Sequence, residues 1–121
     1  MFKKLLVIVG IVLSGFSAAA QNKVTGKVVD ATTLSPEPGA VVQLFTGGTE
    51  TENMKGYAIS DSLGLFSISY KNIQPGTESI VQVMNMGRKT VQKTVTLREG
   101  TTDAGAIALE DDIQAIQRKL F

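Results

Sequence analysis

The sequence predicts an all-β fold, a seven-stranded antiparallel sandwich of two sheets, on three observations. Beyond the first 20 residues, Val, Ile and Thr make up 28 of the remaining 101, and β-branched side chains favour strands over helices. The apolar runs are short, and turn-forming residues interrupt the chain about every 8–12 residues, which is typical of a sandwich. In several runs apolar and polar residues alternate with the period of a half-buried strand.

The first 20 residues differ in composition from the rest and indicate an export signal. Fourteen of them are hydrophobic, against 38 of the remaining 101. The basic Lys3 and Lys4 precede the apolar run Leu5–Phe16, and the small residues Ser17–Ala20 follow it. This order is that of a secretory signal peptide, and we expect cleavage after Ala20. An uncleaved anchor needs about 17–25 apolar residues, and the chain has no cysteine for lipid attachment.

The first half of the remaining chain predicts four strands. They cover Lys23–Val29, Ala40–Phe45, Tyr57–Ser60 and Leu65–Tyr70. Two prolines prevent regular pairing in the turn-rich Asp30–Gly39, and Thr46–Gly56 is expected to be a polar loop. A hairpin joins the last two strands, because Asp61 can bond its own backbone and Gly64 can take positive φ.

The second half predicts three further strands. They cover Ser79–Met84, Lys89–Leu97 and Ala106–Leu109. In the middle one, Lys93 has the same parity as the apolar Val91 and Val95. A β-bulge could redirect this lysine, but we interpret the segment as an edge strand whose inward-leaning lysine opposes unwanted pairing.

The last segment, Glu110–Phe121, changes in character. Ile113, Ile116 and Leu120 stand at helical spacing, with acidic residues first and basic residues last, as a helix dipole favours. A helix this short is marginal in water on its own. The segment therefore predicts either one short amphipathic helix packed on the sandwich or a linker.

The composition excludes several classes of function. The chain has no His, Cys or Trp, so it lacks imidazole and thiol catalysis and the ligands of a structural zinc site. Its formal net charge of +1 falls to about −1 once Lys3 and Lys4 are removed. A nucleic-acid partner calls for a clustered basic surface, so we expect none.

Four carboxylates are the candidates for a calcium site, which needs several oxygens converging at about 2.3–2.6 Å. They are Asp30, Glu50, Glu52 and Asp61. Turn formation by the aspartates and a solvated loop for the glutamates is the simpler interpretation. Nothing in their spacing indicates a paired-carboxylate hydrolase, and the serines have no histidine base. We expect no catalytic, cofactor-binding or metal-binding residue, and no enzyme activity.

Two further groups of residues have a functional and a structural interpretation. Lys55, Arg88 and Lys89 could form a small basic spot, but a solvated surface is the simpler interpretation. Tyr57 and Tyr70 could stack on a sugar ring, but Tyr70 has the parity of its apolar neighbours on the same strand, which favours the core.

Five segments, in order, resemble the carboxypeptidase regulatory-like domains, a group with a transthyretin-like seven-stranded sandwich. They are Gly26–Asp30, Pro38–Leu44, the Asp-x-x-Gly-x-Phe hairpin within Ser60–Phe66, Gly87, and the closing Gly-x-Ile-x-Leu strand Gly105–Leu109. The resemblance spans Val24–Leu109. Arg88 departs from it, because the family usually has an aromatic residue after that glycine.

The resemblance implies an exported, non-catalytic accessory module like those that precede TonB-dependent receptors in the outer membrane. With the signal peptide at residues 1–20, we expect a sandwich domain at 21–109 and a tail at 110–121. We expect a protein partner at the outer membrane, in the periplasm or at the cell surface, contacted through a sheet edge or the Thr46–Gly56 loop. A carbohydrate-binding module, with Tyr57 and Tyr70 exposed on one flat face, and a structural subunit of a surface assembly are the alternatives. The domain is either free-standing or the front of a longer protein.

Overall fold

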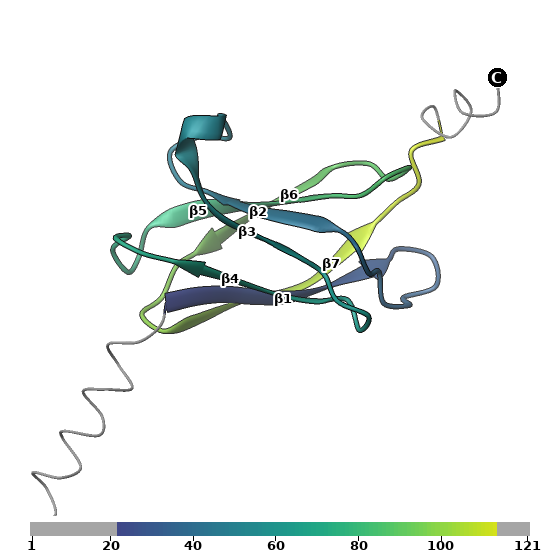
Figure 1. The fold of residues 1–121 in the computed structure, drawn as a ribbon, viewed down its shortest axis with the longest axis horizontal. Helices are drawn as coiled ribbons and strands as arrows, with labels where there is room; N and C mark the ends of the chain where they lie inside the picture. The colour runs from purple at the N-terminus through teal and green to yellow at the C-terminus, as the bar shows by residue number, and fades with distance from the viewer. Residues whose placement is uncertain (1–21, 114–121) are drawn as a thin grey trace, which may run out of the picture.

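A computed structural model of the protein describes residues 22–113, which form an all-β sandwich (Figure 1). Seven strands build it: β1 (Asn22–Asp30), β2 (Val41–Phe45), β3 (Met54–Ile59), β4 (Leu65–Tyr70), β5 (Glu78–Met84), β6 (Val91–Thr96) and β7 (Thr101–Leu109). A 3₁₀ turn, η1 (Thr51–Asn53), precedes β3. The expected signal peptide, and the expected tail from residue 114 onward, lie outside the described residues. Within residues 22–113, no helix is long and apolar enough to span a membrane.

The strands form a three-stranded sheet, β4-β1-β7, and a four-stranded sheet, β3-β2-β5-β6. This confirms the expected seven-stranded sandwich. One pair differs from the antiparallel expectation, because β1 and β7 run parallel. Strand β6 belongs to the other sheet, so the chain reaches β7 by crossing between the layers and not by a hairpin. In Figure 1 the described chain enters β1 at one end of the sandwich and leaves β7 at the opposite end.

The predicted strand boundaries need corrections in three strands. Strand β6 covers Val91–Thr96 and not Lys89–Leu97. Strand β3 starts at Met54 and not at Tyr57, so the expected Thr46–Gly56 loop is wrong at its end. Strand β7 starts at Thr101 and not at Ala106. The register of β7 with β1 shifts near its middle, where Gly105 has a φ of 76°. This bulge interrupts the alternation, which is why the sequence pattern shows only the second half of the strand.

The core lies between the sheets and consists of the inward residues of every strand. Phe66, Ile68 and Tyr70 of β4 are buried, and the serines between them are exposed, as their parity predicts. Leu44 and Val42 of β2 face them from the other sheet as fully buried side chains. Each such side chain contributes about 1.5–3 kcal/mol by leaving water, so the core alone can hold this cysteine-free domain together.

The sandwich has two open sides where edge strands of different sheets lie near one another. On one side β6 approaches β7, and there Lys93 Nζ donates a hydrogen bond to Ala104 O at 2.5 Å. The expectation that Lys93 belongs to an edge strand is confirmed, and its ammonium occupies a backbone acceptor on the neighbouring edge. On the other side β3 approaches β4. The tight turn at Asp61 and Gly64 forms as expected, but the expected hairpin is wrong, because β3 and β4 belong to different sheets and do not pair. The turn carries the chain from one sheet to the other, and we call residues 59–65 the β3–β4 turn.

Candidate functional site

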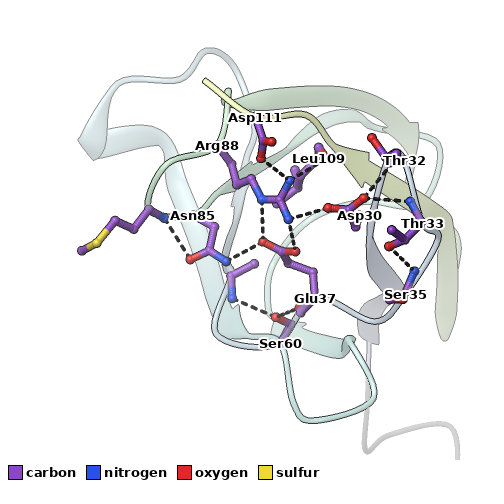
Figure 2. A network of polar contacts seen from close by, with 12 residues as sticks. Asp30, Thr32, Thr33, Ser35, Glu37, Ser60, Asn85, Arg88, Leu109 and Asp111 are labelled. Atoms are coloured by element: carbon purple, nitrogen blue, oxygen red, sulfur yellow. Dashed lines mark hydrogen bonds and ion pairs between the residues drawn. The ribbon is translucent and has the colours of Figure 1, made fainter. Parts of the chain in front are cut away.

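A dense polar site lies at the end of the sandwich where the chain leaves β7 (Figure 2). We call it the Arg88 cluster. Its members come from four segments: Asp30 from the end of β1, Glu37 from the β1–β2 loop, Asn85 and Arg88 from the β5–β6 loop, and Asp111 from the segment after β7. The cluster therefore joins parts of both sheets at one point.

The Arg88 guanidinium is at the centre of the cluster. Its Nη2 donates to Asp30 Oδ2 at 2.6 Å and to Glu37 Oε1 at 2.8 Å, and its Nε donates to Glu37 Oε2 at 3.1 Å. Its Nη1 donates to Asp111 Oδ1 at 2.7 Å. The Arg88 and Glu37 side chains are only 17% and 11% exposed. Such a planar, forked donor can hold several carboxylates at once, which a lysine ammonium cannot do with the same geometry.

The β1–β2 loop holds both acidic partners in place. Asp30 Oδ1 accepts hydrogen bonds from the backbone N–H groups of Thr32 and Thr33 at 2.8 and 2.9 Å, which leaves its other oxygen for Arg88. The backbone of Glu37 donates to Val28 O at 2.9 Å and accepts from the buried Ser60 hydroxyl at 2.7 Å. Both carboxylates are thus positioned by contacts other than the one with arginine.

The segment after β7 is fastened to the β5–β6 loop beside the cluster. Lys89 N donates to Glu110 O, and Asp112 N donates to Gly87 O, both at 2.9 Å. Arg88 and Asp111 form an isolated antiparallel bridge between these two backbone bonds. The segment therefore leaves the sandwich in a fixed direction as far as Asp112.

The charges of the cluster reinforce one another. The pKa of Asp30 falls from its usual 3.8 to about 2, because Thr33 N–H, the Arg88 guanidinium and Thr32 N–H all stabilise the carboxylate. The hydrogen bond to Asp30 likewise raises the pKa of Arg88 above its usual value. Both groups remain charged at neutral pH. Because its pKa is so low, the Asp30 carboxylate is a poor general base. The arrangement suits a structural role better than proton transfer.

The carboxylates expected as calcium candidates are not brought together. Within residues 22–113, no group of three or more acidic residues is placed to hold a metal ion. Asp30 belongs to the Arg88 cluster, and Asp61 accepts bonds from Leu63 N and Leu65 N at 2.9 Å each. The interpretation of these two aspartates as turn formers is confirmed. Glu50 accepts a bond from Asn53 Nδ2 in the loop before β3.

Lys55 and Lys89 are exposed, as the solvated-surface interpretation predicts. That interpretation is wrong for Arg88, whose side chain is only 17% exposed and is surrounded by carboxylates. Sequence reasoning missed the cluster itself. Its one signal was Arg88 itself, which stands where the resembled domains usually have an aromatic residue.

The two tyrosines lie in different environments. Tyr70 is 6% exposed and belongs to the core, as expected. Burial raises its pKa, and its hydroxyl donates to Arg98 O at 3.3 Å. Tyr57 is 65% exposed on β3. The flat face with both tyrosines exposed, expected of one kind of carbohydrate module, is therefore absent from the described part of the chain.

A second surface feature is the β3–β4 turn, which joins the two sheets. It carries exposed apolar side chains on β3, in the turn and on β4: Ile59, Leu63 and Leu65 are 59%, 61% and 45% exposed. The turn between the strands is held by Gly64 N donating to Asp61 O at 2.9 Å and Asp61 N donating to Leu65 O at 3.0 Å. A rigid turn thus presents three large apolar side chains to solvent.

No protein-family model and no curated protein matches the chain. Among solved structures, it is similar to the 5-hydroxyisourate hydrolase of Klebsiella pneumoniae, with 13% identity and a TM-score of 0.54 over 72% of this chain and 90% of that one. It is also similar to the pilus 2b backbone protein of group B streptococcus, with 12% identity and a TM-score of 0.56 over 78% of this chain and 42% of that one.

A third similar structure is a type II cohesin–X-dockerin complex from Acetivibrio cellulolyticus, with 19% identity and a TM-score of 0.50 over 70% of this chain and 52% of that one. The chain thus spans less than two thirds of the pilus and cohesin–dockerin chains that it matches. At these identities the similarity is one of fold. It confirms the expected transthyretin-like, or prealbumin-like, sandwich.

Proposed function

We propose that this protein is an exported, non-catalytic interaction module that binds a protein partner at the outer membrane or cell surface through the β3–β4 turn. The observation that carries the proposal is the exposure of Ile59, Leu63 and Leu65 at this one turn between the sheets. Large apolar side chains gathered at one place on a surface mark contact sites more often than scattered ones do.

The two open sides of the sandwich differ in how well their edge strands are protected against pairing with another strand. At β6 and β7 the Lys93 ammonium covers a backbone acceptor, a device that opposes the addition of another strand. At the other side, β3 from Gly56 to Ile59 and the whole of β4 carry no charged side chain. The side formed by β3 and β4 is therefore the better edge for a partner strand.

Strand addition is the mode that we propose for the contact. Ser60 N donates to Ala40 O, and the alternation of an antiparallel ladder then directs the backbone groups of Ala58 toward β2 and those of Tyr57 and Ile59 away from it. A partner strand could form hydrogen bonds with these backbone groups of β3 while its side chains pack on the β3–β4 turn. Near Gly56 the Ser69 carbonyl comes close to β3, so the accessible stretch is its end near Ile59.

The comparisons support an interaction or structural module. Proteins of the same fold include a pilus backbone protein and a cohesin–dockerin complex. The proposed relationship to the carboxypeptidase regulatory-like domains and the proposed export rest on the sequence segments and the expected signal peptide. The absence of His and Cys from the chain, and the engagement of Asp30 and Glu37 with arginine, support a non-catalytic role.

Site-specific photocrosslinking in the native host tests the proposed contact. A photoreactive residue in place of Leu63 should give one discrete protein adduct, and the same residue in place of the exposed Thr94 of β6 should not. Leu65→Asp in the same chain should abolish the adduct. No adduct at Leu63, or equal adducts at both positions, would contradict the proposal.

Amino-terminal sequencing of the protein from envelope fractions tests the proposed export. A mature end at Gln21 is expected, and an intact Met1 end would contradict it.

A further inference from the structure

A row of uncharged polar side chains crosses the outward face of the four-stranded sheet. The strand register places Tyr57 of β3 opposite Gln43 of β2, Gln43 opposite Gln82 of β5, and Gln82 opposite Gln92 of β6. The residues that alternate with them, Val42 and Val81 among others, are buried in the core. The four side chains therefore share the solvent face, and we call them the glutamine row.

The amides of the glutamine row are joined by hydrogen bonds in one direction. Gln92 Nε2 donates to Gln82 Oε1 at 2.7 Å, and Gln82 Nε2 donates to Gln43 Oε1 at 3.1 Å. Among the described residues, no hydrogen bond uses the Nε2 of Gln43 or the Oε1 of Gln92. The row thus offers a free donor on Gln43, opposite Tyr57, and a free acceptor on Gln92 at the other end. The hydrogen bonds between the amides fix the side-chain conformations before a ligand binds.

The rows on either side of the glutamine row are also uncharged. One consists of Ile59, Val41 and Met84, and the other of Met54, Phe45, Ile80 and Thr94. Lys93 of β6 follows Gln92 but has the opposite parity, and its ammonium bonds to Ala104 O at the other edge. The other charges on these strands are at their ends, on Lys55 and Glu78. A face with amide donors and acceptors, an exposed aromatic ring and no charge is matched by a ligand that is polar, rich in hydroxyl groups and itself uncharged.

We infer that the glutamine row binds a neutral linear oligosaccharide laid across the strands. Four strands about 4.8 Å apart give the row a length of about 14 Å, which is comparable to that of a trisaccharide. The 65% exposed Tyr57 ring provides the stacking surface at one end, and the amides bond to hydroxyl groups along the rest. This site uses one tyrosine and three amides, in contrast to the two-tyrosine face that the sequence suggested.

Titration of ¹⁵N-labelled protein with neutral linear hexasaccharides of glucose, mannose and xylose, followed by NMR, tests the inference. At least one of them should shift the side-chain amide signals of Gln43, Gln82 and Gln92 in the millimolar range. Tyr57→Ala and Gln82→Ala should each weaken that binding about fivefold or more, as the loss of one stacking contact or hydrogen bond implies. Ser67→Ala, a matched change on the exposed face of the other sheet, should leave it unchanged.

Two outcomes would overturn the inference. One is that no neutral hexasaccharide of the panel moves these signals. The other is that a hexasaccharide of uronic acids moves them equally, since the uncharged face would then give no selectivity.

The site shares β3 with the proposed protein contact but uses other groups, the side chains of the row and not the backbone edge and the β3–β4 turn, so the two can be separated. Gln82→Ala should leave the Leu63 photoadduct intact, and Leu63→Asp should leave oligosaccharide binding intact. If the photoadduct itself is lost in Gln82→Ala, the face is part of a protein interface, and the oligosaccharide site is refuted. Circular dichroism of each variant confirms that these exposed changes leave the fold intact.

Discussion

Arg88 and Asp30 are 58 positions apart in the sequence, and Arg88 Nη2 lies 2.6 Å from Asp30 Oδ2. The contact links the β5–β6 loop of one sheet to the last residue of β1 in the other. With Glu37 and Asp111, it closes one end of the sandwich with charge-assisted bonds, where cysteine-containing exported domains often use a disulfide.

Replacement of Arg88 should destabilise the fold strongly. Arg88→Met leaves the carboxylates of Asp30 and Glu37 without the cation that they share, at a partly exposed site, so we expect a loss of about 1–3 kcal/mol in the free energy of unfolding. Urea denaturation at pH 7 measures it. The matched variant Lys89→Met breaks only an exposed pair at 3.8 Å and should cost less than about 0.5 kcal/mol. Equal losses in the two variants would contradict the assigned role of the cluster.

Acid should weaken the protein through Asp30. Its pKa is lower in the folded state, about 2 against the usual 3.8, so its contribution to stability is complete above the usual value and is lost as the pH falls toward 2. The urea midpoint of Asp30→Asn should be below that of the unaltered protein at pH 7, and the difference should shrink between pH 4 and pH 2. Glu52→Gln, on the exposed η1 turn, should reproduce neither effect. A gap that stays constant with pH would show that the Asp30 charge is not responsible.

Removal of Lys93 should promote self-association. Lys93→Thr frees Ala104 O and gives β6 a side chain that favours strands, so the β6–β7 side loses its protection against edge pairing. Light scattering at increasing concentration should show higher oligomers for this variant. Lys89→Thr removes the same charge from an exposed loop and should associate no more than the unaltered protein does. If both variants behave alike, net charge and not the edge contact governs association.

Two glycines with the same backbone conformation should tolerate alanine differently. Gly64 and Gly39 have φ of 77° and 76°, so alanine costs about 1 kcal/mol at either position from backbone strain. At Gly64 the added Cβ would also collide with Val28 O, whereas at Gly39 it would meet nothing within 4 Å. We expect Gly64→Ala to lower the free energy of unfolding by about 2 kcal/mol more than Gly39→Ala does. Thermal unfolding of the pair gives the comparison, and similar melting temperatures would contradict it.

The strands were predictable because alternation is a local property. In β4 the parity of Phe66, Ile68 and Tyr70 predicts both the bounds of the strand and the face that it buries. Likewise, the parity of Lys93 with two valines predicts an edge strand. Each of these inferences depends only on neighbours within a few residues.

The Arg88 cluster was not predictable, because its members come together only when both sheets are in place. Nothing near Arg88 in the sequence reveals that the carboxylates of Asp30 and Glu37, more than 50 positions earlier, will surround it. The parallel pairing of β1 with β7 was not predictable for the same reason. It depends on which layer the chain enters after β6, and neither strand's own sequence encodes that choice.

The parallel arrangement of β1 and β7 has a mechanical consequence. Because the described chain enters at the start of β1 and leaves at the end of β7, tension between Asn22 and Leu109 would pull the two strands lengthwise past each other. All hydrogen bonds of that pair would then bear the load together instead of opening one after another. The domain should therefore resist unfolding more strongly under tension along these two strands than under tension across them.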